Sequence, residues 1–266
     1  PAAAPATAAD VEASFPDLAA HGRWMHIEPW DKVWVPAANG TTWWRPYYLG
    51  QWVWTEYGWT WASEEPWGWG PYHYGRWAWH ANWRWVWVPD NTWGPAWVIW
   101  RSGGGCVGWA PIGPGGHAWG HHAYWTFVPH AHMTSHQVYH VVVPPERVTV
   151  VYNQSQPVGS DVRIRNPAGQ TVIYNSGPAR DDVKGWVGRD VVPRPANGVP
   201  GAVPRRPGGD PAAPRPDAVD PHRPSTDGTD PRARDRGNIP LPPRPARPGE
   251  LRPDGAAPPA IVPAPA

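Results

Sequence analysis

The stretch GQWVWTEYGWTWASEEPWGWGPYHYGRW, residues 50–77, decides the fold class of this chain. Tryptophan alternates with other residues at Trp52/Trp54 and again at Trp59/Trp61, and this two-residue period places the indoles on one face of a strand. Each run is short and is bounded by glycine, proline or polar residues, which are typical of turns. The pattern predicts short antiparallel strands and no helix in this region.

The same arrangement is repeated along the chain with a period of roughly 25 residues. Three landmarks recur in order: G-x-W, then a W-x-W or V-W-V strand, then W-[RG]-P. The G-x-W landmark begins at Gly22, Gly50 and Gly75, and a partial fourth unit begins at Gly108. The repeats predict an all-β fold, an antiparallel meander of roughly nine or ten short Trp-rich strands that forms a small barrel or a sandwich.

Composition divides the chain into regions of different character. Twenty-two of the 23 tryptophans lie between Trp24 and Trp125, and from residue 193 onward proline, arginine, aspartate and glycine dominate. Such a composition buries too little apolar surface to offset the entropy of ordering. We therefore expect an Ala/Pro-rich linker (1–14), a Trp-rich repeat β domain (15–116), a His-rich connector (117–140), strand-like segments with one short helix (141–192) and a disordered Pro/Arg-rich tail (193–266). The strand-like segments are the runs YHVVVP, RVTVVY, DVRIR and TVIYN.

Charge and terminal sequence bear on location and partners. The net charge of +1 lacks the basic excess of a dedicated nucleic-acid binder, so no nucleic-acid partner is expected. No run of 18 apolar residues is present, so no transmembrane segment is expected. The chain begins with Pro1 in an Ala/Pro-rich stretch, which is typical of a mature exported protein. Cys106 is the only cysteine, and an intrachain disulfide is therefore excluded.

Longer motifs carry a family resemblance. Residues 50–77, together with WRWVWVPDNTWGPAWVIWR (83–101) and GWAPIGP (108–114), resemble the tryptophan-rich exported bacterial family DUF6600, often found in proteins also labelled FecR-like. The likeness covers about residues 15–192. It implies export and a place in the cell envelope, at the periplasm or cell surface. The family has no settled activity that could be carried over to a residue of this chain.

The densest aromatic segment is a candidate ligand-binding surface. Trp and Tyr faces can stack on the C–H groups of a sugar ring, while neighbouring polar groups reach its hydroxyls. A single tryptophan at strand spacing is more often a core residue, although a small domain cannot bury every one of so many indoles. If this segment binds a glycan, its rings form a flat exposed row. The candidate residues are Trp59, Trp61, Glu64, Glu65, Trp67, Trp69, Tyr72, His73 and Tyr74.

The adjacent Glu64 and Glu65 raise the question of glycosidase chemistry. Such enzymes hold two carboxyl groups ~5–9.5 Å apart across a cleft, whereas neighbours on a turn usually point in different directions. The structural interpretation is that Ser63 and Glu64 satisfy a tight turn, and that Glu65 is solvated or pairs with Arg76. No catalytic residues are assigned.

Histidines in the connector are candidate metal ligands. Imidazole nitrogens suit zinc, copper or nickel, but the spacing matches no structural zinc pattern and no cysteine assists. A solvated pH-sensitive loop is the alternative. Phosphate-loop, dinucleotide and EF-hand motifs are missing, so no cofactor is expected. The candidate ligands are His117, His121, His122, His130 and His132.

The sequence therefore favours a non-enzymatic exported envelope protein that acts as a structural or interaction module. Its expected partners are a cell-wall polysaccharide or an envelope protein. A carbohydrate- or peptidoglycan-binding domain with exposed Trp/Tyr rings is the alternative, and an enzyme acting on glycans is a weaker one.

Overall fold

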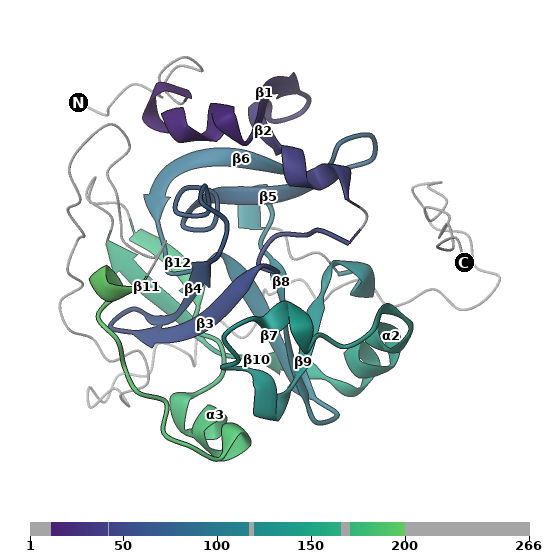
Figure 1. Ribbon diagram of the computed structural model, residues 1–266, viewed down its shortest axis with the longest axis vertical. Coiled ribbons are helices and arrows are strands. Elements are labelled where there is room, and N and C mark those ends of the chain that lie inside the picture. The colour runs from purple at the N-terminus through teal and green to yellow at the C-terminus, as the bar shows by residue number, and fades with distance from the viewer. Residues whose placement is uncertain (1–11, 42, 117–119, 166–170, 200–266) are drawn as a thin grey trace, which may run out of the picture. The chain divides into compact units, whose positions relative to one another are not determined.

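The computed structural model describes residues 12–41, 43–116, 120–165 and 171–199; most of the predicted linker and tail positions 200–266 lie outside them. The described residues form mostly antiparallel strands with few helices, as the sequence predicts (Figure 1). The strands are β1 (Gly22–Ile27), β2 (Asp31–Pro36), β3 (Gly50–Thr55), β4 (Gly58–Ser63), β5 (Tyr74–His80), β6 (Arg84–Trp93), β7 (Val98–Gly103), β8 (Cys106–Pro111), β9 (Thr126–Pro129), β10 (Gln156–Val158), β11 (Asp161–Arg165) and β12 (Thr171–Asn175). The helices are α2 (Pro145–Gln154), α3 (Arg180–Val187) and the 3-10 turns η1 (Pro16–Ala20), η2 (Ala37–Gly40), η3 (Pro114–Gly116), η4 (His122–Tyr124), η5 (His130–His132), η6 (Val138–His140) and η7 (Ala196–Gly198).

The strands assemble into two four-stranded sheets, with orders β1-β2-β6-β5 and β10-β7-β8-β9, and two separate hairpins, β3-β4 and β11-β12. Each sheet keeps two edge strands, so within the described residues neither closes into a barrel. Not every strand pairs with its neighbour in sequence, because β2 pairs with β6 across the intervening β3-β4 hairpin through Trp34 and Trp87. The repeat unit is a hairpin, and hairpins distant in sequence associate through their indoles.

The glycine of each G-x-W landmark has a specific packing role. A Cβ on Gly50 would lie 2.3 Å from the carbonyl oxygen of Ala62 and 2.8 Å from the indole of Trp61. Only a residue without a side chain allows the indole of the partner strand to lie directly against the backbone. The same surroundings recur at Gly22, against Val35 and Trp34, and at Gly75, against Val88 and Trp87.

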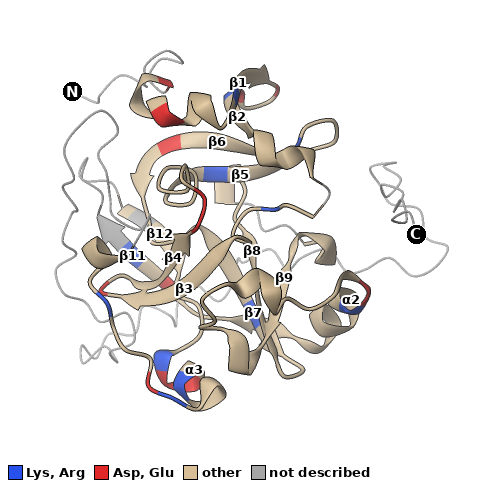
Figure 2. Ribbon diagram, viewed as in Figure 1, with Lys and Arg blue, Asp and Glu red and all other residues tan. Residues whose placement is uncertain are grey.

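The core consists largely of tryptophan rings from different hairpins. The Trp52 ring centre lies 5.0 Å from that of its cross-strand partner Trp61. It also lies 4.4 Å from Trp100 and 5.4 Å from Trp109, which form the cross-strand pair of β7-β8. Each buried indole removes ~150–250 Å² from water. Trp52 therefore joins the β3-β4 hairpin to the second sheet. Figure 2 shows that most strand positions are uncharged and that charges gather on α3.

The region after residue 116 differs from its prediction. Residues 126–129 of the expected connector form β9, which pairs with β8 and completes the second sheet. The run RVTVVY lies within helix α2 and is not a strand, and YHVVVP begins with the last two residues of the turn η6. The remaining two runs do form a hairpin, β11-β12, and one short helix, α3, follows. Among the described residues, no helix is long and apolar enough to cross a membrane.

The first residues of the predicted tail pack on the β3-β4 hairpin. The Arg194 backbone N–H donates to the carbonyl oxygen of Trp54 (2.9 Å), and that of Ala196 donates to the Glu56 carboxylate (2.9 Å). Val199 is buried with Val53 and Ala62. Residues 194–199 of the predicted tail therefore satisfy backbone groups on the hairpin and bury apolar side chains there.

This packing leads to a stability prediction. Val199→Asp is expected to lower the free energy of unfolding by about 2–3 kcal/mol, because it places a carboxylate in an apolar contact. Urea denaturation followed by circular dichroism measures the change. Val192 is 68% exposed, so Val192→Asp is the matched control and is expected to be neutral. Equal effects of the two substitutions would contradict the packing of this segment.

Candidate functional site

The aromatic residues predicted to form an exposed row lie in the core. Trp61 and Tyr72 are fully buried, and Trp69, the most accessible of the set, is 8% exposed. The Trp59 indole N–H donates to the carbonyl oxygen of Pro178 (2.9 Å). His73 is also buried, with Nδ1 3.0 Å from the carbonyl oxygen of Gly94. The buried rings are Trp59, Trp61, Trp67, Trp69, Tyr72 and Tyr74. They form no exposed row, because strands from other hairpins cover the face that a ligand would need.

Glu65 points inward from the same segment. Its carboxylate accepts hydrogen bonds from the indole N–H of Trp44 (2.7 Å) and from the hydroxyl of Tyr72. Burial raises the pKa of the Glu65 carboxyl to about 7, although both hydrogen bonds favour the ionised form and act in the opposite direction. The expected pairing with Arg76 does not occur, since that guanidinium lies 3.3 Å from the ring centre of Trp97. Glu65 is thus a half-buried structural acid.

Glu64 points outward. Its carboxylate lies 3.4 Å from the amide nitrogen of Gln137 and 4.0 Å from the Nδ1 of His136. The turn itself is held as predicted, because the Ser63 hydroxyl accepts the backbone N–H of Glu65 (3.0 Å). One carboxylate of the pair lies among core aromatics and the other at the surface. They do not face each other across a substrate position.

The predicted metal ligands are spread over several turns. His121 and His122 stack on each other with ring centres 4.2 Å apart. His130 shares a hydrogen bond with the Ser102 hydroxyl (2.9 Å) and stacks on Trp186; burial lowers its pKa. His132 is exposed, with its Nδ1 3.4 Å from the Ser135 hydroxyl, and His117 lies outside the described residues. Where the structure describes the chain, no three His, Cys, Asp or Glu side chains gather to hold a metal ion.

A different group of rings does reach the surface. Trp43 is 51% exposed, and its ring centre lies 6.0 Å from that of Tyr48. The ring centre of Tyr48 lies 6.5 Å from that of Tyr139. The ring centre of Tyr139 lies 4.2 Å from that of His140. These four residues come from the segment between η2 and β3 and from η6. We call them the Trp43–His140 row.

Polar groups border the Trp43–His140 row. The Arg45 guanidinium lies 5.9 Å from the ring centre of Tyr48 and donates to the carbonyl oxygens of Ala123 (3.2 Å) and Trp125 (3.1 Å). At the other side lie Glu64 and Gln137, the latter two residues before Tyr139. The backbone N–H of Glu64 donates to the carbonyl oxygen of Leu49 (3.1 Å), which follows Tyr48 directly. A carboxylate, an amide and an imidazole therefore lie beside the rings.

Sequence reasoning missed this row because it followed the alternating strands. The useful signal was the pair of doublets in WWRPYY, residues 43–48. Adjacent aromatic residues of a loop can face opposite ways, and Tyr47 lies in a turn with φ 58°. Trp44 and Tyr47 are buried, whereas Trp43 and Tyr48 face outward.

Comparisons with known proteins support the family resemblance over residues 15–116 and supply no activity. No curated protein and no solved structure matches this chain. Residues 15–116 match DUF6600, a family of unknown function. The match ends after β8 and η3, so it covers the four tryptophan hairpins but stops before β9. The match to this family thus spans the tryptophan-rich repeat region of the chain.

Proposed function

We propose that this protein is a non-enzymatic, exported module of the cell envelope that binds a wall glycan on the Trp43–His140 row. The observation that carries the proposal is the surface position of these rings in a chain whose other aromatic side chains are mostly core. Export and the envelope setting are supported by the resemblance to an exported family. A non-enzymatic role is supported by the separation of Glu64 from Glu65 into different environments.

A glycan suits the row because of its two kinds of surface. The C–H face of a pyranose ring packs on an indole or phenol ring, which removes apolar area from water on both partners. The hydroxyl groups at its edge need hydrogen-bonding partners, and Glu64, Gln137 and His136 lie beside the rings. An extended row of rings favours an extended ligand over a compact one. A polysaccharide chain meets all three requirements.

The proposal predicts the effect of removing one ring. Trp43→Ala is expected to weaken binding roughly threefold to tenfold, because one stacking contact is lost. Isothermal titration of the full chain with soluble peptidoglycan fragments and with a panel of neutral polysaccharides measures this effect. Tyr139→Ala is expected to act in the same direction.

The control for this experiment is Trp30→Ala, which removes a partly exposed indole from the turn between β1 and β2. It is expected to leave the affinity unchanged. Circular dichroism of each variant checks that the fold is intact. If folded Trp43→Ala and Tyr139→Ala proteins bind every glycan as tightly as the original chain does, the Trp43–His140 row is not the binding site.

A further inference from the structure

A groove of about 520 Å³ lies beside the β1-β2 hairpin of the first sheet. It runs between the end of η1, the β1-β2 hairpin, η2 and the tip of the β5-β6 hairpin. None of the candidate ligand-binding or metal-binding residues described above lines it. Its volume falls within the ~300–1,000 Å³ range of small-molecule sites. Its polar and aromatic lining comes from Arg23, Asn39, Asn82, Trp83 and Arg84.

The walls of the groove are held together by hydrogen bonds. The Asn39 side-chain amide donates to the carbonyl oxygens of Trp83 (2.5 Å) and Trp85 (2.8 Å), which ties η2 to β6. At the hairpin tip, the Nδ1 of His80 accepts the backbone N–H groups of Asn82 (3.2 Å) and Trp83 (3.3 Å). Both walls are therefore fixed in the protein without a ligand, which lowers the entropic cost of binding one.

The charged side chains that line the groove are positive. Two arginines line it, and among the residues that the structure describes no aspartate or glutamate does. The Arg23 guanidinium lies 5.7 Å from the ring centre of Trp83, and that of Arg84 donates to the carbonyl oxygen of Thr41 (3.1 Å). The Trp83 ring thus positions the Arg23 guanidinium, and the contact with Thr41 positions that of Arg84.

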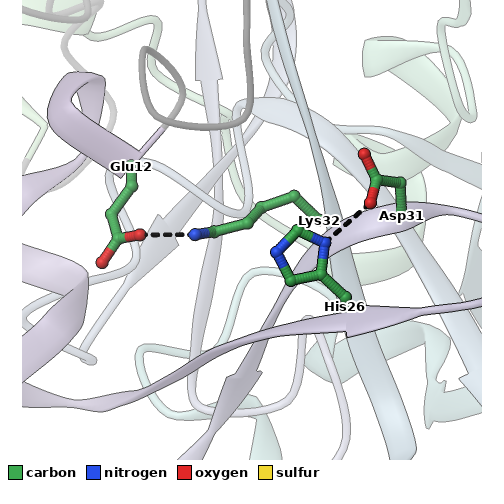
Figure 3. A network of polar contacts seen from close by, with 4 residues as sticks. All are labelled: Glu12, His26, Asp31 and Lys32. Carbon is green, nitrogen blue, oxygen red and sulfur yellow. Dashed lines mark hydrogen bonds and ion pairs between the residues drawn. The ribbon is translucent and has the colours of Figure 1, made fainter.

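Two carboxylates near the β1-β2 hairpin, those of Asp31 and Glu12, interact with other positively charged or imidazole side chains. Asp31 lies 2.7 Å from the Nδ1 of His26, and Glu12 accepts a hydrogen bond from Lys32 (2.6 Å), as Figure 3 shows. The Lys32 ammonium also lies 5.9 Å from the ring centre of Trp24. These contacts join the acids to cations that do not line the groove, so the positive charge of its two arginines is not offset by them.

We propose that this groove binds an anionic sugar unit, with Arg23 and Arg84 pairing with its carboxylate or phosphate and the half-buried Trp83 ring forming an apolar wall. Guanidinium groups suit both anions because their planar N–H donors can bind two oxygens at once. The choice of a saccharide rests on the proposed function. The groove ends at Gly40, three residues before Trp43, so one stretch of chain leads from the groove to the Trp43–His140 row.

The test compares anionic probes with their uncharged counterparts. The full chain is titrated calorimetrically with trigalacturonate, with its fully methyl-esterified form, and with glucose 6-phosphate against glucose. We expect at least one anionic sugar to bind, its neutral counterpart to bind about tenfold more weakly or not at all, and Arg23→Gln to weaken the anion about tenfold. The affinity is also expected to fall as salt is added. Arg163→Gln, at an exposed arginine of β11, is the matched control and is expected to have no effect.

The outcomes separate this inference from the proposed function. Binding of trigalacturonate, of glucose 6-phosphate or of both identifies the anion as carboxylate, phosphate or either. The inference is overturned if no anionic sugar binds, if the ester binds as tightly as the acid, or if Arg23→Gln and Arg84→Gln leave the affinity unchanged. If one of these results is found and peptidoglycan binding still depends on Trp43, the proposed function holds and the groove inference fails. If anion binding depends on Arg23 but no glycan binding depends on Trp43, the groove inference stands and the proposed function fails.

Discussion

Gly75→Ala is expected to lower the free energy of unfolding by about 3 kcal/mol or more. Two physical effects add at this position. The backbone of Gly75 has φ +66°, a left-handed conformation that costs ~1–2 kcal/mol for an L-residue. A Cβ there would also lie 2.3 Å from the carbonyl oxygen of Val88 and 2.7 Å from the indole nitrogen of Trp87. Neither atom can move without opening the β5-β6 pairing. Urea denaturation followed by circular dichroism measures the loss.

Gly58→Ala is the control that separates these two effects. Gly58 also has a positive φ, +89°, but a Cβ there would have no atom within 4 Å. Its replacement is expected to cost only the conformational term, ~1–2 kcal/mol. Equal destabilisation by Gly58→Ala and Gly75→Ala would show that the close approach of the indole to the landmark glycine does not matter for stability.

The half-buried Glu65 is expected to make the free energy of unfolding fall as the pH rises from 4.5 to above 7. The folded-state pKa of about 7 exceeds the ordinary value of 4.5. Between these values the folded protein binds more protons than the unfolded chain, so the contribution of this group is fully present below pH 4.5 and is lost as the pH rises through 7. At about 1.36 kcal/mol per pKa unit, the loss is about 3 kcal/mol.

Glu65→Gln isolates this contribution, because glutamine keeps an oxygen that can accept from Trp44 and does not ionise. The difference in unfolding free energy between the original chain and Glu65→Gln is expected to shrink by about 3 kcal/mol between pH 4.5 and pH 8. Glu64→Gln, at the neighbouring exposed carboxylate, is expected to give a pH profile parallel to that of the original chain. Parallel profiles for Glu65→Gln would contradict the burial of this acid.

The sequence contained most of the local architecture of the repeats. The landmark glycines Gly22 and Gly50 open β1 and β3, and Gly75 lies at the second position of β5. Alternation of tryptophan located the strands because a half-buried strand has a strict two-residue period. Pairing between hairpins was not accessible, since contacts such as that between Trp52 and Trp100 depend on tertiary packing and leave no local signal.

The helix α2 shows where local pattern fails. RVTVVY is rich in β-branched residues, which favour strands. In the structure, Pro145 occupies the first turn of the helix, and Val148 and Val151, three residues apart, turn toward the sheet and are buried. Arg101 donates to the Ser155 hydroxyl (2.9 Å) just after the helix. Tertiary contacts override the intrinsic propensity here.

The candidate site was harder to predict than the fold. Alternation identifies strand tryptophans but not whether a second layer covers them, and for Trp59 and Trp61 it does. The exposed ring of Trp43 lies in a segment without strand pairing, between η2 and β3. The inward position of its neighbour Trp44 depends on Glu65, 21 residues away. Only the folded chain brings the two loops of the Trp43–His140 row together.

The tryptophans of residues 59–69 form part of the core, and we propose that the loop residue Trp43 contacts the ligand instead. Fluorine NMR of the full chain labelled with 5-fluorotryptophan and titrated with soluble peptidoglycan fragments tests it directly, with Trp43→Phe assigning the Trp43 resonance. The Trp43 resonance is expected to shift in a saturable way, while the resonances of Trp59, Trp61, Trp67 and Trp69 are expected to stay in place. Saturable shifts of these four resonances with an unchanged Trp43 signal would contradict this proposal.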